Sequence, residues 1–202
     1  MTESIKPSTP ETDTETGDAG TRAAAIEAPL ALLAELTHRC PFHCPYCSNP
    51  LQLEAASREL DTATWCRVMD EAAELGMHQV HFSGGEPLVR RDLERLVARA
   101  AEVGLYTNLI TSAVTLTRER LAALAEAGLD HVQISFQSSE EGLGNRIGGY
   151  RKGHAKKLEA ATWVRDLDLP LAIKARGADI HYWGGKGYAK TAMLAAAEPA
   201  SQ

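Results

Sequence analysis

The fold and the chemistry of this chain meet in one stretch, residues 32–47, which reads LLAELTHRCPFHCPYC. Residues 32–36 are predicted to form a strand, and Cys40, Cys44 and Cys47 follow in the loop at its carboxyl end. Three thiolates so close together, with no fourth cysteine nearby, suit a [4Fe–4S] cluster that leaves one iron open to a ligand. A structural zinc site would usually close its fourth position.

Outward from this stretch, strand-like and helix-like segments alternate along the chain. Asp61 and Thr117 are predicted helix caps, and Gly128 is predicted to end a helix. The alternation predicts an α/β fold with a parallel sheet and right-handed crossovers. It leaves undecided whether this is a barrel or an open sheet. The further strands are predicted at 79–83, 105–110, 131–137 and 169–173, and the helices at 61–75, 91–103, 117–127 and 156–167.

Two of the predicted strands are apolar on one face only. In residues 79–83, valine and phenylalanine alternate with glutamine, histidine and serine, and residues 131–137 follow the same pattern. Parallel strands that are covered by helices on both sides should be apolar on both faces. The polar face therefore indicates a barrel whose lumen holds a hydrophilic ligand. An edge strand that faces water would explain one of these strands, but less easily both.

Polar residues also follow the carboxyl ends of the strands. The second strand runs into Gly84-Gly85-Glu86-Pro87, the third ends in residues 108–112, and the fourth ends in residues 135–137. Ligand sites in parallel α/β folds lie outside these ends. We therefore expect the three thiols, the double glycine with its carboxylate, and several hydroxyls and amides to surround one cavity.

The composition is that of a globular protein, with 44% hydrophobic and 24% charged residues. A net charge of −6 argues against nucleic acid as the partner. No apolar stretch approaches the roughly 18 residues of a membrane helix, and the N-terminus lacks the pattern of a secretory signal. Clustered cysteines indicate metal ligands in a reducing compartment, so we expect a cytoplasmic protein.

The chain divides into three parts by composition. Residues 1–28 are poor in bulky apolar residues and are expected to form a disordered tail. Residues 29–174 form the core, and residues 175–202 form an atypical C-terminal tail. Within that tail, residues 184–191 invite a phosphate-loop interpretation, but Ala189 replaces the second glycine of that motif and no strand clearly precedes it.

The cysteine spacing, followed by Gly84-Gly85-Glu86-Pro87, resembles the radical S-adenosylmethionine (radical SAM) superfamily. The runs at 32–40, 44–51, 82–88, 106–112 and 128–137 are similar to the coenzyme PQQ synthesis protein E family, the PqqA peptide cyclases. The resemblance covers residues 31–170 and implies a partial radical SAM (β/α) barrel of parallel strands, incomplete at the C-terminus. Members of the family continue to a six-unit barrel and a cysteine-rich region with auxiliary clusters, whereas this chain has no cysteine after Cys66. We expect a truncated or frame-altered version.

The resemblance assigns the cofactors. It implies that Cys40, Cys44 and Cys47 bind three irons of a [4Fe–4S] cluster, and that the fourth iron chelates S-adenosylmethionine. One electron from the reduced cluster would then yield a 5′-deoxyadenosyl radical, which abstracts hydrogen from the substrate.

The contacts to S-adenosylmethionine follow from the same resemblance. Gly84 and Gly85 would let the backbone approach the methionyl amine, because no Cβ intervenes. Glu86 would accept a hydrogen bond from that ammonium, and Tyr46 would lie by the adenine. The residues that would reach ribose or carboxylate are Asn108, Thr111, Ser135 and Gln137.

The substrate and partners are also implied by the resemblance alone. The substrate would be the PqqA precursor peptide, in which a glutamate and a tyrosine side chain become joined by a carbon–carbon bond. The small carrier PqqD would present that peptide, and an electron donor would reduce the cluster. The alternatives are a non-catalytic remnant that binds the cluster or a partner only, and another peptide-modifying radical SAM enzyme.

Three further interpretations concern single residues. A structural zinc site would take His38 or His43 as its fourth ligand. Cys66 is predicted to be a small core residue. The run Arg90-Arg91, with Asp92 and Glu94, is interpreted as a solvated helix start.

Overall fold

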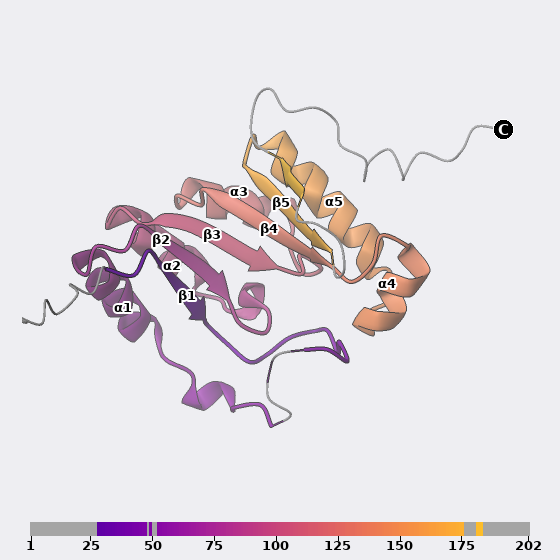
Figure 1. Cartoon of the computed structure of the whole chain (residues 1–202), viewed down its shortest axis with the longest axis horizontal. Helices are drawn as coiled ribbons and strands as arrows, with labels where there is room; N and C mark the ends of the chain where they lie inside the picture. Colours follow the sequence, from indigo (N-terminus) through magenta and orange to yellow (C-terminus); the bar gives the residue numbers. More distant parts are fainter. Residues whose placement is uncertain (1–27, 48, 50–51, 176–180, 184–202) are drawn as a thin grey trace, which may run out of the picture.

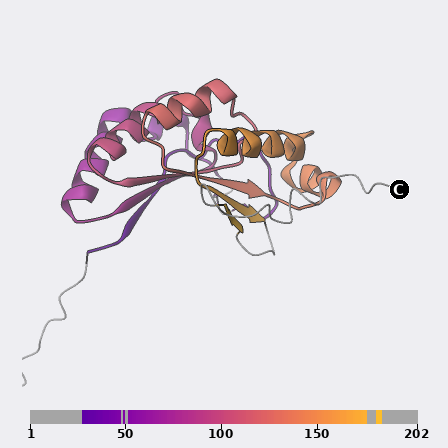
Figure 2. The same ribbon diagram turned by 90° about the horizontal axis from the view of Figure 1, so that it is seen from above.

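The protein is a single twisted sheet with its helices gathered on one face, as Figures 1 and 2 show for this computed structural model. The structure describes residues 28–47, 49, 52–175 and 181–183. The sheet has the strand order β1-β2-β3-β4-β5-β6, with the first five strands parallel and β6 antiparallel to β5. The strands are β1 (Ala31–Glu35), β2 (Gln79–Ser83), β3 (Tyr106–Thr111), β4 (His131–Phe136), β5 (Leu171–Ala175) and β6 (His181–Trp183).

The helices fill the connections between the parallel strands. This confirms the predicted α/β fold, all five predicted strands and all four predicted helices, with ends that shift by a few residues. The helices are α1 (Thr62–Glu74), α2 (Leu93–Glu102), α3 (Arg118–Glu126), α4 (Glu141–Gly148) and α5 (Gly153–Asp166), together with the 3-10 helices η1 (Ala56–Arg58) and η2 (Pro87–Val89).

The predicted helix caps are present. The Asp61 carboxylate accepts a hydrogen bond from the Thr64 N–H at 2.8 Å, and the Thr117 hydroxyl accepts one from the Arg120 N–H at 3.2 Å. Gly128 follows α3 with a φ of +100°, a conformation that favours glycine.

Two elements were not predicted. Helix α4 contains three glycines, and its buried positions are Gly144 and Gly148, so it shows no apolar periodicity. Strand β6 lies where no strand was expected, just before the possible phosphate loop. That loop, the predicted tail at 1–28 apart from residue 28, and most of the predicted tail at 175–202 lie outside the described residues.

The core lies between the sheet and the helices. Alternate strand residues such as Val80, Phe82 and Ile134 are fully buried there, and Met69 of α1 and Leu96 of α2 pack against them. Burial of each such side chain stabilises the fold by about 1.5–3 kcal/mol. Cys66 packs against this core from α1, partly buried, as predicted.

The other face of the sheet carries no helix among the described residues (Figure 2). Its residues include Gln79, His81 and Ser83 of β2, which are half-buried. The predicted split between an apolar and a polar face is therefore confirmed. No helix among the described residues is long and apolar enough to cross a membrane.

Candidate functional site

The cysteine loop leaves the carboxyl end of β1 and runs below the strand ends toward α4 (Figure 1). Cys40 and Cys44 are half-buried, Cys47 is exposed, and all three thiols are free. The Cys47 N–H donates to the Cys44 carbonyl at 3.0 Å, which closes a tight turn around the exposed Tyr46. The loop therefore presents three unoxidised sulfur donors at the edge of the sheet where ligands bind.

Burial governs the protonation of these thiols. It raises the pKa of Cys40 to about 11, and the nearby Cys44 and Cys47 add smaller increases. Burial also raises the pKa of Cys44, against the lowering effect of Lys157 and Gln137. A bound metal would displace these protons, because only the thiolate is a strong ligand.

The donor set fits a cluster by its chemistry. Among the described residues, no three His, Cys, Asp or Glu side chains converge closely enough to hold a single metal ion. A cubane cluster does not need that convergence, because each thiolate binds a different iron. Of the two histidines considered as zinc ligands, His38 accepts a hydrogen bond from the Glu54 N–H through Nδ1 at 3.0 Å, and His43 is exposed.

The two glycines after β2 lie against the chain that leads into Cys40. The Gly85 N–H donates to the Thr37 carbonyl at 2.6 Å. A Cβ on Gly84 would lie 2.5 Å from the Thr37 oxygen, and one on Gly85 would lie 2.5 Å from the Arg39 oxygen. Glycine is therefore required for a close backbone approach, as expected. The partner observed in that approach is the backbone of Thr37 and Arg39, and the approach to the methionyl amine stays a prediction.

Glu86 is fully buried and already has its hydrogen bonds. Its carboxylate accepts from the Leu88 N–H at 3.1 Å, the Thr111 hydroxyl at 2.6 Å, the Ser112 N–H at 2.8 Å and the Ser112 hydroxyl. These four donors match the capacity of a carboxylate. Glu86 thus ties the loop after β2 to the end of β3, and its contact with the ammonium of S-adenosylmethionine stays a prediction.

Thr111 and Asn108 were predicted to share one site, but they lie on opposite faces of β3. The Thr111 hydroxyl donates to Glu86 and accepts from the Ala113 N–H at 2.8 Å, on the face that the helices cover. Asn108 lies on the open face, because side chains alternate along a strand. The structure therefore does not bring Thr111 together with Asn108.

Asn108 joins two histidines in a row across the open face. Its amide lies 2.8 Å from His81 Nδ1 and 2.7 Å from His131 Nδ1, since the register places the three residues on neighbouring strands. Burial, with a smaller contribution from His81, lowers the pKa of His131. On β4, His131 lies four residues before Ser135, about 13 Å along the strand at 3.3 Å per residue.

Gln137 lies beside the cysteine loop, and Ser135 precedes it by two residues at the end of β4. Gln137 Nε2 donates to Cys44 Sγ at 3.7 Å. The ammonium of Lys157, which is 1% exposed, donates to the Ser135 carbonyl at 2.7 Å and to Gln137 Oε1. Burial lowers the pKa of Lys157 to about 8, although the negative charges of Cys44, Glu86 and Cys40 act to raise it.

Phe42 anchors the cysteine loop to the junction of α4 and α5. Its ring stacks on Tyr150 with centroids 5.3 Å apart, and the Lys157 ammonium lies 4.5 Å from its centroid. A Cβ on Gly148 would lie 2.5 Å from Phe42 Cδ1, so only glycine leaves room for the ring. The His43 N–H donates to the Gly148 carbonyl at 3.1 Å.

Sequence reasoning missed this anchor, although one signal was available. Gly153, Lys157, Ala160 and Val164 are the buried residues of α5, at helical spacing. A lysine in such a stripe marks a buried charge. Phe42 gave a weaker signal as the one bulky apolar residue among the cysteines.

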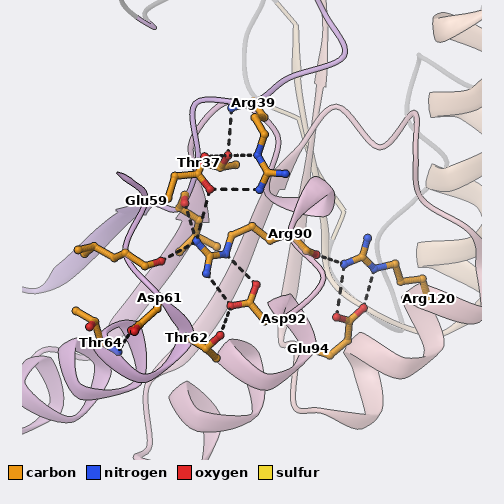
Figure 3. Close-up of polar contacts among 12 residues, drawn as sticks. Thr37, Arg39, Glu59, Asp61, Thr62, Thr64, Arg90, Asp92, Glu94 and Arg120 are labelled. Atoms are coloured by element: carbon orange, nitrogen blue, oxygen red, sulfur yellow. Dashed lines mark hydrogen bonds and ion pairs between the residues drawn. The ribbon is translucent and has the colours of Figure 1, made fainter. Parts of the chain in front are cut away.

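Arg90 was interpreted as part of a solvated helix start, but it is 6% exposed. Its guanidinium donates to the carbonyls of Leu36 at 3.0 Å and Leu60 at 3.1 Å, and to both oxygens of Asp92 (Figure 3). These hydrogen bonds lower the pKa of Asp92 to about 2. Backbone carbonyls without local partners attract a buried guanidinium, which the sequence pattern does not reveal.

Other ion pairs extend this network (Figure 3). Glu59 accepts from the Thr37 hydroxyl at 2.5 Å and from Arg39 at 3.2 Å. Arg120 donates to the Arg90 carbonyl at 2.6 Å and to Glu94 at 2.7 Å. A cavity of about 560 Å³ opens beside the network, and its charged lining residues are Arg39, Glu59, Asp61, Arg90, Arg91 and Asp92.

Comparison with known proteins points to one family. Residues 34–176 match the model of the Radical SAM superfamily. The chain is 64% identical over 156 residues to a PqqA peptide cyclase of Rhodopseudomonas palustris, covering 77% of this chain and 41% of that protein. It is 64% identical over 153 residues to that of Bradyrhizobium diazoefficiens, covering 76% and 40%. The chain thus spans about 40% of the length of these relatives.

Solved structures share the fold. SuiB of Streptococcus suis bound to its precursor peptide SuiA superposes with a TM-score of 0.65 at 21% identity, over 74% of this chain and 33% of SuiB. SuiB bound to S-adenosylmethionine gives a TM-score of 0.62 at 22% identity, over the same shares of both chains.

Proposed function

Because the chain belongs to the radical SAM superfamily, we propose that it is the cofactor-binding part of a PqqA peptide cyclase. The cofactors of the superfamily are a [4Fe–4S] cluster and S-adenosylmethionine. The proposal is supported by the 64% identity over 156 residues to a PqqA peptide cyclase. The observation that carries it is the placement of three free thiols at the carboxyl end of β1, beside Gln137 at the end of β4.

In this proposal Cys40, Cys44 and Cys47 bind the cluster. When both cofactors are bound, they supply a 5′-deoxyadenosyl radical that removes hydrogen from the substrate. The chain's own residues hold the site in place: Gly84 and Gly85 fix the segment that enters Cys40, and Phe42 fixes the middle of the loop.

The residues proposed to contact S-adenosylmethionine lie at two depths along the open face of the sheet. Gln137 lies next to the cysteine loop, Ser135 lies two residues before it on β4, and Tyr46 lies within the loop. Asn108 lies deeper on the open face and is assigned to a more distant part of a ligand. Glu86 and Thr111 are assigned to support the site, because their side chains bind each other.

The substrate and partners are proposed from the relatives. The substrate is the PqqA precursor peptide, in which glutamate and tyrosine side chains are joined. PqqD presents the peptide and an electron donor reduces the cluster. The compartment is the cytoplasm, where thiols remain reduced.

Anaerobic reconstitution of the full chain tests this function. We expect a brown protein with about four irons per chain, and loss of this iron in Cys44→Ala. Cys66→Ala is the matched control, because Cys66 packs in α1 against the core and should leave the iron unchanged. A colourless or zinc-loaded wild type would contradict the proposal.

Two further assays separate the alternatives. Reductive cleavage of S-adenosylmethionine, together with a cross-link in PqqA that mass spectrometry detects, supports the cyclase. Cleavage without a cross-link in the presence of PqqD points to another peptide-modifying radical SAM enzyme. A cluster without cleavage points to a chain that binds cofactor only.

A further inference from the structure

Lys157 is a buried charged residue, and no carboxylate among the described residues forms an ion pair with it. Its side chain is 1% exposed, on a face of α5 whose other buried residues are Gly153, Ala160 and Val164. Its two hydrogen-bond acceptors, the Ser135 carbonyl and Gln137 Oε1, are both uncharged. A buried ammonium costs free energy unless negative charge lies nearby.

The cysteine loop brings negative charge near Lys157 when a cluster is bound, because the cluster ligands are thiolates. Cys44 is the group whose charge acts most strongly on Lys157, followed by Glu86 and Cys40. Glu86 is already held by four donors. Gln137 links the ammonium to the sulfur, because its Oε1 accepts from Lys157 and its Nε2 donates to Cys44 Sγ at 3.7 Å.

Two aromatic rings exclude water from this contact. The Lys157 ammonium lies 4.5 Å from the centroid of Phe42 and 5.5 Å from that of Phe136. Both rings belong to buried residues. A charge in such surroundings acts over a longer range than one in water, because the effective dielectric constant is lower.

We propose that Lys157 is a positioning residue that holds a fixed positive charge beside the cluster thiolates and raises the reduction potential of the cluster. The inference rests on the proposed function, since it requires the cluster. Reduction adds one electron, and so one negative charge, to the cluster. A nearby positive charge stabilises the reduced form more than the oxidised form.

The test compares three variants of the full chain after reconstitution. Lys157→Gln removes the charge and keeps an NH₂ group with two N–H donors, and Lys157→Arg keeps the charge. Lys156→Gln removes an equal charge from the neighbouring residue, which is exposed and whose ammonium donates to the Val114 carbonyl at 3.3 Å. The midpoint potential is measured by titration with dithionite in the absence of S-adenosylmethionine, followed by electron paramagnetic resonance.

We expect Lys157→Gln to lower the ratio of reduced to oxidised cluster about tenfold at a fixed potential, which is a shift of about 59 mV for one electron. Lys157→Arg and Lys156→Gln should stay within about twofold of the wild type, because exposed charge is screened. If Lys157→Gln assembles no cluster while Lys157→Arg assembles one at the wild-type potential, the requirement for charge is also supported.

Three results overturn the inference while the proposed function stands. Lys157→Gln can hold a full cluster at the wild-type potential. Lys156→Gln can produce the same shift as Lys157→Gln. Both Lys157 variants can fail to hold a cluster although their apo forms melt at the wild-type temperature. Cluster assembly would then depend on the shape of the lysine side chain and not on its charge. A wild-type chain without a cluster overturns the proposed function itself, and the inference with it.

Discussion

The loops that follow β1 and β2 lie against each other, yet they differ in how many hydrogen bonds their functional side chains receive from the protein. In the loop after β2, Glu86 is fully buried and receives four hydrogen bonds from protein donors. In the loop after β1, the three thiols are half-buried or exposed, and the side-chain contact to Cys44 is a 3.7 Å hydrogen bond to sulfur. The loop after β2 therefore supports the site with its polar groups already paired. The loop after β1 keeps its sulfur atoms available for a ligand.

The largest effect should come from Glu86→Gln, which attacks the support. Either orientation of the new amide places its NH₂ group against a backbone donor, because the Leu88 N–H faces one oxygen and the Ser112 N–H faces the other. We expect a loss of about 2–4 kcal/mol in the free energy of unfolding, since a buried donor loses its acceptor. Urea unfolding followed by circular dichroism measures it.

The matched control for Glu86→Gln is Glu74→Gln in α1. Glu74 is exposed, so the free energy of unfolding of the Glu74→Gln variant should stay within about 0.5 kcal/mol of the wild-type value. Coincident urea midpoints for the wild type and both variants would mean that Glu86 is not the support described above.

A smaller effect is expected where the cysteine loop meets α4. In Gly148→Ala the new Cβ would lie 2.5 Å from Phe42 Cδ1, so the ring must move. We expect a loss of about 1–3 kcal/mol from overpacking, together with less iron after reconstitution. Gly142→Ala in the same helix is the control, because its Cβ would meet the ends of two flexible side chains, those of Glu140 and Arg146. Equal iron content in both variants would mean that the contact with α4 is not needed for the cysteine loop to bind iron.

The smallest effect should come from Asp92→Asn, and it should depend on pH. The hydrogen bonds from Arg90 lower the pKa of Asp92 from 3.8 to about 2. The folded form therefore gains stability above the ordinary pKa, and this gain is lost as the pH falls through about 2. The variant should be less stable by about 1 kcal/mol at pH 7, and the difference should shrink by about pH 3. Denaturant titrations at both pH values measure it, and a constant difference would exclude the carboxylate charge as its cause.

The sequence predicts the frame better than the contacts. Residues 79–83 form a strand with the predicted ends, because alternating apolar residues bounded by glycine are a strong local signal. Helix α4 is not predicted, since it lacks an apolar stripe and packs through Gly148 against Phe42, a contact distant in sequence. Local pattern carries no information on such contacts.

The site shows the same division. The cysteine spacing predicts the three thiols as ligands, and the order of the strand ends predicts Gln137 near them, which the contact of Gln137 with Cys44 supports. The prediction for Thr111 puts its side chain on the wrong face of β3. Side chains alternate between the two faces of a strand, so an error of one residue in the assumed pattern reverses the face. Lys157 is missed, because a lysine is normally exposed and its burial becomes visible only in the folded structure.

The row of Asn108 with two histidines fixes where protons reside on the open face. The amide oxygen of Asn108 faces His131, so the Nδ1 of that ring carries hydrogen and its Nε2 has a lone pair. The amide nitrogen faces His81, so Nδ1 of that ring is bare and its Nε2 carries hydrogen. One asparagine thereby presents an acceptor to one imidazole and a donor to the other, and the open face gains a directed row of hydrogen bonds.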